Sequence, residues 1–200
     1  MRDVKIVVAR YNENLDWLNK LNYPNIVYNK NKQDNLLFEH NLINIGKDAH
    51  TYLTYILNNY NNLPEYVVFL QGHPFDHHCN NLIEWLNDYK FDTLFYPIGA
   101  TYVRDIDSLV EAAVQYAKEY NIAYELPLKF IAGMQCIVAK ELIQRNPKEM
   151  YLALLESILT DKESTGPGQK DNNSYNIWNL EYLWPTIFGA NTTMPIKSCL

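Results

Sequence analysis

The feature that most limits the fold of this chain is a pair of apolar runs, each of which ends abruptly in polar residues. The first run spans Val4 to Ala9, with Lys5 as its one polar residue, and is followed by Arg10. The second spans Tyr66 to Leu70 and is followed by Gln71. Strands without polar alternation are typical of parallel sheets that are buried on both faces. Parallel strands require helical crossover connections, so we expect strands and helices to alternate along the chain.

The remaining sequence contains the helices and short strands that such a fold needs. Apolar residues recur at helical spacing in four segments, which begin after Gly46, after Asn80 or Asn81, after Asp107 and after Pro147. Asparagine and aspartate are favoured helix caps, and proline is tolerated in the first turn of a helix. Further short strands are expected at residues 25–28, 93–96 and 131–139, the last of them interrupted at Gly133.

Length and composition limit the number of domains. The chain has 200 residues, of which 48% are hydrophobic and 20% charged, and these values describe one ordinary folded domain. We find no internal repeat and no linker. We therefore expect a single α/β domain over residues 1–200, with a mostly parallel central sheet and helices on both faces. The glycine- and proline-rich segment 164–174 is expected to be a mobile surface loop.

Charge and cysteine content argue against several classes of protein. The net charge is −6 and the basic residues form no tract, which argues against binding to nucleic acid or to an anionic membrane. Three cysteines without CxxC spacing argue against a disulfide framework and against structural zinc. The N-terminal segment resembles neither a signal peptide nor a membrane anchor, and no apolar run has membrane-spanning length. We therefore expect a cytoplasmic protein, whose oligomeric state the sequence does not indicate.

The polar residues that follow the two apolar runs are the first candidates for a binding site. In open α/β sheets, ligands bind beyond the carboxyl ends of the strands. The residues concerned are Arg10, Asn12 and Glu13 after the first strand and Gln71, Gly72, His73 and Asp76 after the other. A further candidate is Gly46-Lys47 at a helix start, where free backbone N–H groups and an ammonium group favour an anion such as phosphate.

The segment that contains His73, Asp76, His77 and His78 allows a second interpretation. His73 and His77 are four positions apart, a spacing that places two imidazoles on one face of a helix, as a transition-metal ion would need. Pro74 makes helical geometry at His73 unfavourable, and the sequence fixes no third ligand. The alternatives are therefore a metal site and a helix start at which Asp76 is favoured by the helix dipole.

Glu181 is the candidate for a catalytic base. It lies between Trp178 and Trp184 in an aromatic segment, and a carboxylate beside aromatic surface can have a raised pKa. The alternative is a solvated glutamate on an amphipathic helix. The sequence contains no G-x-S-x-G, P-loop or G-x-G-x-x-G motif, which argues against serine hydrolases, P-loop NTPases and dinucleotide-dependent enzymes.

Four stretches of the sequence together resemble a family that is known only as domain of unknown function 3431 (DUF3431). They are VVARYNENLDWL, YNK, NIGKDAHTYLTYILNNYNNLPEYVVFLQGHPFDH and FIAGMQCIVAKELIQRNPKEMY, and the resemblance runs from about Val7 to Phe188. A more distant similarity is to family-2-type glycosyltransferases of the GT-A fold. Those enzymes have a strand ending in a YNE-like turn, an Asn-x-Gly segment before a helix, and then a strand that ends in acidic residues. Here the same order is kept by residues 10–13, 44–46 and 66–73.

The resemblance to GT-A enzymes implies a glycosyltransferase that moves a sugar from a nucleotide-diphosphate donor to a hydroxyl of a carbohydrate or other acceptor, without an organic cofactor. The implied donor-binding residues are Arg10, Asn12, Glu13, Gly46, Lys47, Gln71, Gly72 and His73. The implied acceptor-side residues are Gly133, Gln135, Trp178 and Trp184. The implied catalytic residues are Glu181, as the base, and Asp76.

One departure from the GT-A pattern bears on metal dependence. Where those enzymes have an Asp-x-Asp pair that holds a divalent metal on the donor diphosphate, this chain has Gln71-Gly72-His73. A manganese or magnesium ion would then have His73, Asp76 and His77 as ligands, or His73 would meet the diphosphate directly. Two alternatives remain open: a metal-dependent hydrolase built on the histidines and aspartate at 73–78, and a non-catalytic carbohydrate-binding domain derived from a transferase.

Overall fold

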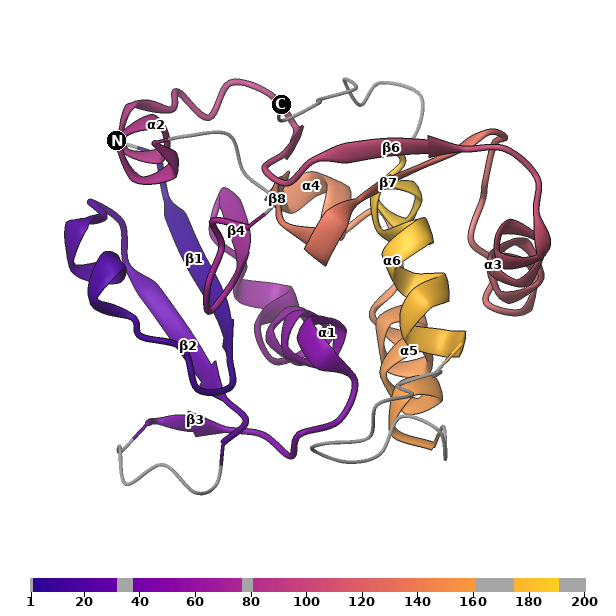
Figure 1. Cartoon of the computed structure of the whole chain (residues 1–200), viewed down its shortest axis with the longest axis horizontal. Coiled ribbons are helices and arrows are strands. Elements are labelled where there is room, and N and C mark those ends of the chain that lie inside the picture. The colour runs from indigo at the N-terminus through magenta and orange to yellow at the C-terminus, as the bar shows by residue number, and fades with distance from the viewer. Residues whose placement is uncertain (1, 32–37, 77–80, 161–174, 191–200) are drawn as a thin grey trace.

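A computed structural model of the chain describes residues 2–31, 38–76, 81–160 and 175–190 (Figure 1). Its largest element is a six-stranded sheet in the order β3-β2-β1-β4-β8-β5. The strands are β1 (Val4–Arg10), β2 (Asn25–Asn29), β3 (His40–Asn41), β4 (Tyr66–Gln71), β5 (Phe95–Pro97) and β8 (Cys136–Ala139). Strands β3, β2, β1 and β4 pair in parallel, whereas β8 is antiparallel to both β4 and β5. The prediction of a mainly parallel central sheet is therefore confirmed.

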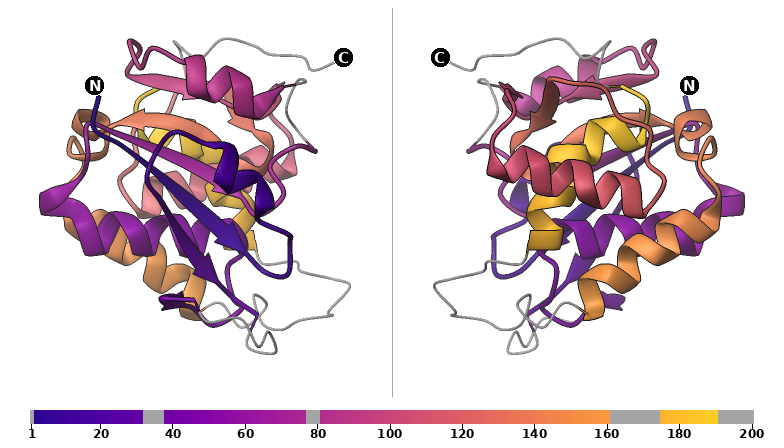
Figure 2. Two further views of the ribbon diagram at one scale, coloured as in Figure 1. Left: turned by 90° about the vertical axis from the view of Figure 1, so that its left-hand side faces the viewer. Right: turned by 90° about the vertical axis from the view of Figure 1, so that its right-hand side faces the viewer.

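Helices cover both faces of this sheet (Figures 1 and 2). One face shares its core with α1 (Lys47–Asn59), α3 (Ser108–Glu119), α5 (Lys148–Thr160) and α6 (Tyr175–Ile187). The other face packs against the 3-10 helix η1 (Asp16–Lys20) and against α2 (Leu82–Asp88). Along β4, Val67 and Phe69 enter the first core, and Val68 and Leu70 enter the second. The two covered faces explain why the strand is apolar at every position from Tyr66 to Leu70.

A second, two-stranded antiparallel sheet is formed by β6 (Thr101–Arg104) and β7 (Leu128–Ile131). The single turn η3 (Ala132–Met134) follows β7 and leads into β8. The prediction of one interrupted strand over 131–139 is therefore wrong, because Gly133, with a φ of 66°, separates strands of two different sheets. Glycine adopts this left-handed conformation without a steric penalty.

The predicted helix starts are present, but one of the predicted caps is not. Asp107 caps α3, because its carboxylate accepts hydrogen bonds from the backbone N–H groups of Leu109 and Val110, both at 2.9 Å. Asn81 precedes α2 with a φ of 69°, and its side chain makes no capping hydrogen bond. A side-chain cap requires an extended backbone at that position, so the prediction for Asn81 is wrong. Asn80 lies outside the described residues.

The order in which strands are added to the sheet reverses at β1. After β1 the chain adds β2 and then β3 on one side, and α1 returns it to β4 on the other side of β1. Ala9 lies opposite Gln71, so β1 and β4 end at the same level. Open α/β sheets bind their ligands at such a point, because the two loops diverge there and leave a crevice. The two polar strand ends noted in the sequence therefore meet. None of the described helices is long and apolar enough to cross a membrane.

A buried hydrogen bond between α3 and α5 offers a test of this packing. The hydroxyl oxygens of Tyr116 and Ser157 lie 2.6 Å apart in the core. Tyr116→Phe removes the bond without opening a cavity, so we expect the free energy of unfolding to fall by about 1 kcal/mol. Urea denaturation measures the change, with the exposed Tyr102→Phe as a matched control that should have no effect. Equal losses in the two variants would contradict this packing.

Candidate functional site

The loop after β1 is held in shape by two charged side chains. The Glu13 carboxylate accepts hydrogen bonds from the backbone N–H groups of Tyr11 and Asn12, at 2.7 and 3.1 Å. The buried Arg10 guanidinium donates to the carbonyl oxygens of Glu13 and Tyr11 and, at 2.7 Å, to the side chain of Asn29 on β2. Arg10 therefore organises the loop, while Asn12 and part of Glu13 stay exposed to solvent.

Glycines allow the loops after β1 and β4, the turn η3 and the helix α6 to meet. A Cβ atom at Gly72 would overlap the Glu13 carboxylate, and one at Gly133 would lie 2.9 Å from the side-chain amide of Gln71. The backbone N–H of Gly133 donates to Glu181 Oε1 at 3.0 Å. The predicted residues Glu13, Gly72, Gln71, Gly133 and Glu181 therefore come together, although they lie in segments far apart in the sequence.

Two glutamines form the inner wall of the site. The Gln71 backbone N–H donates to the side-chain oxygen of Gln135 at 3.2 Å, and Gln135 Nε2 donates to the Pro74 carbonyl at 3.3 Å. Gln135 is completely buried, so the expectation that it faces an acceptor is not met, and it supports the loop after β4. The Gln71 side chain donates to Asp48 Oδ2 at 2.6 Å.

Lys30 and Asp48 also belong to the site, although the sequence patterns did not identify them as candidates. Burial lowers the pKa of Lys30 to about 7, and the Asp48 carboxylate partly opposes this shift. Burial also raises the pKa of Asp48, against the effects of the Gln71 hydrogen bond and the Lys30 charge. Lys30 follows the carboxyl end of β2, so the rule that singled out the ends of β1 and β4 would have found it. The sequence did not distinguish Asp48 as a site residue, because an acidic residue in the first turn of a helix is common.

The aromatic residues of α6 divide into one exposed and one buried residue. Trp178 is 39% exposed, and Lys47 Nζ lies 4.6 Å from the centre of its ring, a cation–π distance. Trp184 is completely buried against Tyr52, Phe69 and Phe188. The expectation of an acceptor-side role for Trp184 is therefore wrong, because the side chain has no surface that an acceptor could touch.

The segment after Gly72 carries the predicted metal ligands. His73 Nε2 lies 3.3 Å from Asp76 Oδ1, and both side chains are largely exposed. The ring of Phe75 contacts both His73 and Trp17, and Trp17 Nε1 donates to the Gly72 carbonyl at 3.0 Å. His77, like His78 and the loop 164–174, lies outside the described residues. Within the described ranges, no three His, Cys, Asp or Glu side chains converge as a metal site requires.

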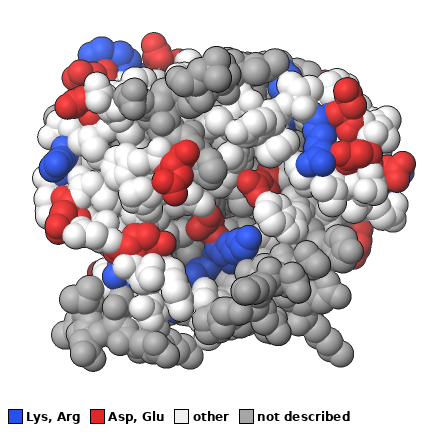
Figure 3. All heavy atoms as spheres, in the orientation of Figure 1, with Lys and Arg blue, Asp and Glu red and all other residues white. Residues whose placement is uncertain are grey.

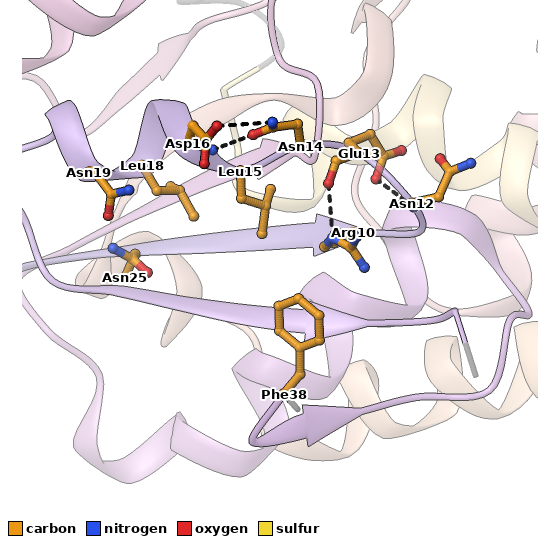
Figure 4. Close-up of a pocket in the computed structure, with 10 residues that line it drawn as sticks. All are labelled: Arg10, Asn12, Glu13, Asn14, Leu15, Asp16, Leu18, Asn19, Asn25 and Phe38. Atoms are coloured by element: carbon orange, nitrogen blue, oxygen red, sulfur yellow. Dashed lines mark hydrogen bonds between the residues drawn. The ribbon is translucent and has the colours of Figure 1, made fainter. Parts of the chain in front are cut away.

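A polar hollow of about 510 Å³ lies beside the loop after β1 (Figure 4). Its described lining consists of Arg10, Asn12, Glu13, Asn14, Leu15, Asp16, Leu18, Asn19, Asn25 and Phe38. The Arg10 guanidinium lies 4.8 Å from the centre of the Phe38 ring. Side-chain amides and an aromatic ring are groups that hydrogen-bond and stack on planar heterocycles.

In the space-filling view, acidic and basic side chains gather around a recess near the middle of the face shown (Figure 3).

The contact between Glu13 and Gly72 provides a test of the site geometry. Gly72→Ala displaces the Glu13 carboxylate from the backbone N–H groups that it binds, so we expect a loss of about 1–3 kcal/mol in the free energy of unfolding. In a Glu13→Ala background the same substitution should cost less than half as much, because the displaced group is absent. Denaturant titration of the four proteins measures this coupling. Additive effects would show that the two residues do not interact.

Comparisons with known proteins agree with one of the resemblances. A search of curated proteins found no match. Residues 6–95 match a protein family described as protein of unknown function (DUF3431). The matched range contains the polar ends of β1, β2 and β4 and the start of α1, and it ends before η3 and α6. Over residues 6–95, a little less than half of its length, the chain is therefore similar to the DUF3431 family.

Proposed function

We propose that the protein is a glycosyltransferase of GT-A-like architecture, which moves a sugar from a nucleotide-diphosphate donor to an acceptor hydroxyl. The observation that carries the proposal is the meeting of the polar ends of β1 and β4 at the point where the strand order reverses. Nucleotides bind at this point in many open α/β sheets. Side chains that hydrogen-bond, stack and carry positive charge are all available around it.

The donor would extend from the hollow beside β1 to the start of α1. Asn12 and Phe38 would contact the nucleoside, since both line the hollow. The diphosphate would lie near Gln71 and His73, within reach of Lys47 and of the backbone N–H groups in the first turn of α1. A divalent cation such as manganese or magnesium would be held by His73 and Asp76, with His77 as a further ligand. The cation would stabilise negative charge on the departing diphosphate.

Transfer would occur on the side of the site formed by η3 and α6. The acceptor oxygen attacks the anomeric carbon of the donor sugar, and its proton passes to the Glu181 carboxylate. The bond between the anomeric carbon and the diphosphate oxygen breaks, and the nucleoside diphosphate leaves with the electron pair. The exposed ring of Trp178 offers a surface on which a sugar can stack.

A second candidate is a carbohydrate-binding domain without catalytic activity. It is favoured by the sequence Gln71-Gly72-His73 at the position where GT-A enzymes carry two aspartates. Such a domain would bind glycans whether or not a nucleotide sugar is present.

A metal-dependent hydrolase would instead retain a stoichiometric transition metal through purification, which elemental analysis would detect.

Nucleotide binding provides the first test of the transferase. We expect uridine or guanosine diphosphate, with or without manganese, to raise the melting temperature by roughly 5 °C at about 100 times its dissociation constant, because it binds only the folded protein. Differential scanning fluorimetry measures the shift, with the free nucleosides as controls for the diphosphate. No shift with any nucleoside diphosphate would refute the proposal.

The proposed base provides the second test. Glu181→Gln preserves the hydrogen bond from the Gly133 N–H but cannot accept a proton, so we expect transfer to slow by roughly 10²–10⁴-fold. Affinity for the nucleoside diphosphate should stay unchanged. The exposed Glu156→Gln on α5 is the matched control and should retain full activity. Full activity in Glu181→Gln would exclude Glu181 as the base.

A further inference from the structure

Lys30 extends from the end of β2 to the turn that precedes α1. Its backbone N–H donates to the Arg10 carbonyl at 2.9 Å and so continues the pairing of β2 with β1. Its side chain is buried, and Nζ donates to the carbonyl oxygens of Ile45, at 2.9 Å, and of Lys47. One ammonium group therefore binds the backbone on both sides of Gly46.

This turn contains two consecutive residues in the left-handed conformation. Gly46 has a φ of 66° and Lys47 a φ of 42°. A lysine rarely adopts such a conformation, and it does so only where the surrounding structure holds it. Gly46 is pressed against α5, because a Cβ atom there would overlap the Ile158 side chain. The Ile45 carbonyl that binds Lys30 also lies 3.1 Å from Nδ1 of His50.

The conformation of the turn determines where two neighbouring side chains of the site lie. Lys47 directs its ammonium group to the exposed ring of Trp178, at 4.6 Å. Asp48 directs its carboxylate to the side-chain amide of Gln71, at 2.6 Å. If the two carbonyls lost the ammonium that binds them, the turn could relax and both side chains would move.

We infer that Lys30 is a positioning residue, whose ammonium group fastens the turn Ile45–Lys47 and thereby holds Lys47 and Asp48 in place for the donor diphosphate. The inference rests on the proposed function only in naming the ligand. Lys30 is itself buried beneath the turn, so its effect on the ligand passes through the backbone that it binds.

The charge of Lys30 gives this role a dependence on pH. The ionisable groups around it are Lys47, Asp48 and His50 on α1 and Arg10 and Glu13 at the end of β1. Burial and the charge of Lys30 lower the pKa of His50 to about 4, so its imidazole is neutral near pH 7. Burial lowers the pKa of Lys30 to about 7, so the ammonium loses its proton as the pH rises above neutrality. Hydrogen bonds from a charged donor are stronger than those from a neutral amine. Phosphate groups lose their last proton near pH 6, so a nucleoside diphosphate gains only a fraction of a negative charge in this range, and that gain would strengthen its binding to a cationic site.

Titration calorimetry with uridine and guanosine diphosphate between pH 6.5 and 9 tests the inference. We expect the affinity of the unmodified protein to fall about tenfold across this range as the ammonium is lost. Lys30→Arg should abolish the decline, because a guanidinium stays charged. Lys30→Met should bind at least tenfold more weakly at pH 6.5, whereas the exposed control Lys118→Met on α3 should behave as the unmodified protein. The same pH profile in the unmodified protein and Lys30→Arg would overturn the inference.

A second measurement separates this inference from the proposed function. If the unmodified protein binds neither diphosphate at pH 6.5, the ligand assignment fails, and the role of Lys30 is then read from backbone amide hydrogen exchange. In Lys30→Met or Lys30→Gln, exchange at the amides of His50 and Thr51, the first in α1 with intrahelical acceptors, should accelerate at least tenfold, with the strands of the central sheet unchanged. Unaltered exchange at these amides would show that Lys30 does not fasten the turn.

Discussion

The parallel pairing of β1 with β4 is the constraint on which the rest of the molecule depends. Up to their last residues, both strands are apolar at every position except Lys5 of β1, because each face of the sheet is covered by its own core. A shift of one residue in this register would exchange the side chains of the two cores. The same register aligns Ala9 with Gln71, so the packing of the interior also decides that the two polar loops begin at one level.

Buried polar side chains then hold the loops that follow these strands in one conformation. Arg10 and Lys30 lie at the carboxyl ends of the neighbouring strands β1 and β2, and both bind backbone carbonyls. Arg10 binds carbonyls of the loop after β1, and Lys30 binds a carbonyl of the turn before α1. A buried charge is costly unless hydrogen bonds satisfy it, and loop carbonyls are the groups that do so here. The loops around the site are therefore held in place by the buried side chains of Arg10 and Lys30. Asn12, Lys47 and Trp178 are exposed beside them and remain available to a ligand.

The sequence predicted the parts of this arrangement that depend on local pattern. Apolar runs indicated the central strands, and the strand-end rule selected Glu13 and Gln71, which do lie in one site. Long-range choices were not predictable. Aromatic spacing on α6 does not reveal that Trp184 faces the core while Trp178 faces solvent. The chain around Gly133 gives no sign that β7 and β8 belong to different sheets, because their partners are distant in sequence.

The reversed strand β8 has a consequence for how the molecule can vary. Because β8 is antiparallel to β4, its first residue, Cys136, pairs with Phe69 near the carboxyl end of β4, so η3 lies at the same end of the sheet as the polar loops. The site is thus shared between an N-terminal half, which contains the family match, and a C-terminal half, which lies beyond it. Neither η3 nor α6 pairs with β1, so a change of an exposed side chain there, such as Trp178, would alter the site without disturbing the register of β1 and β4.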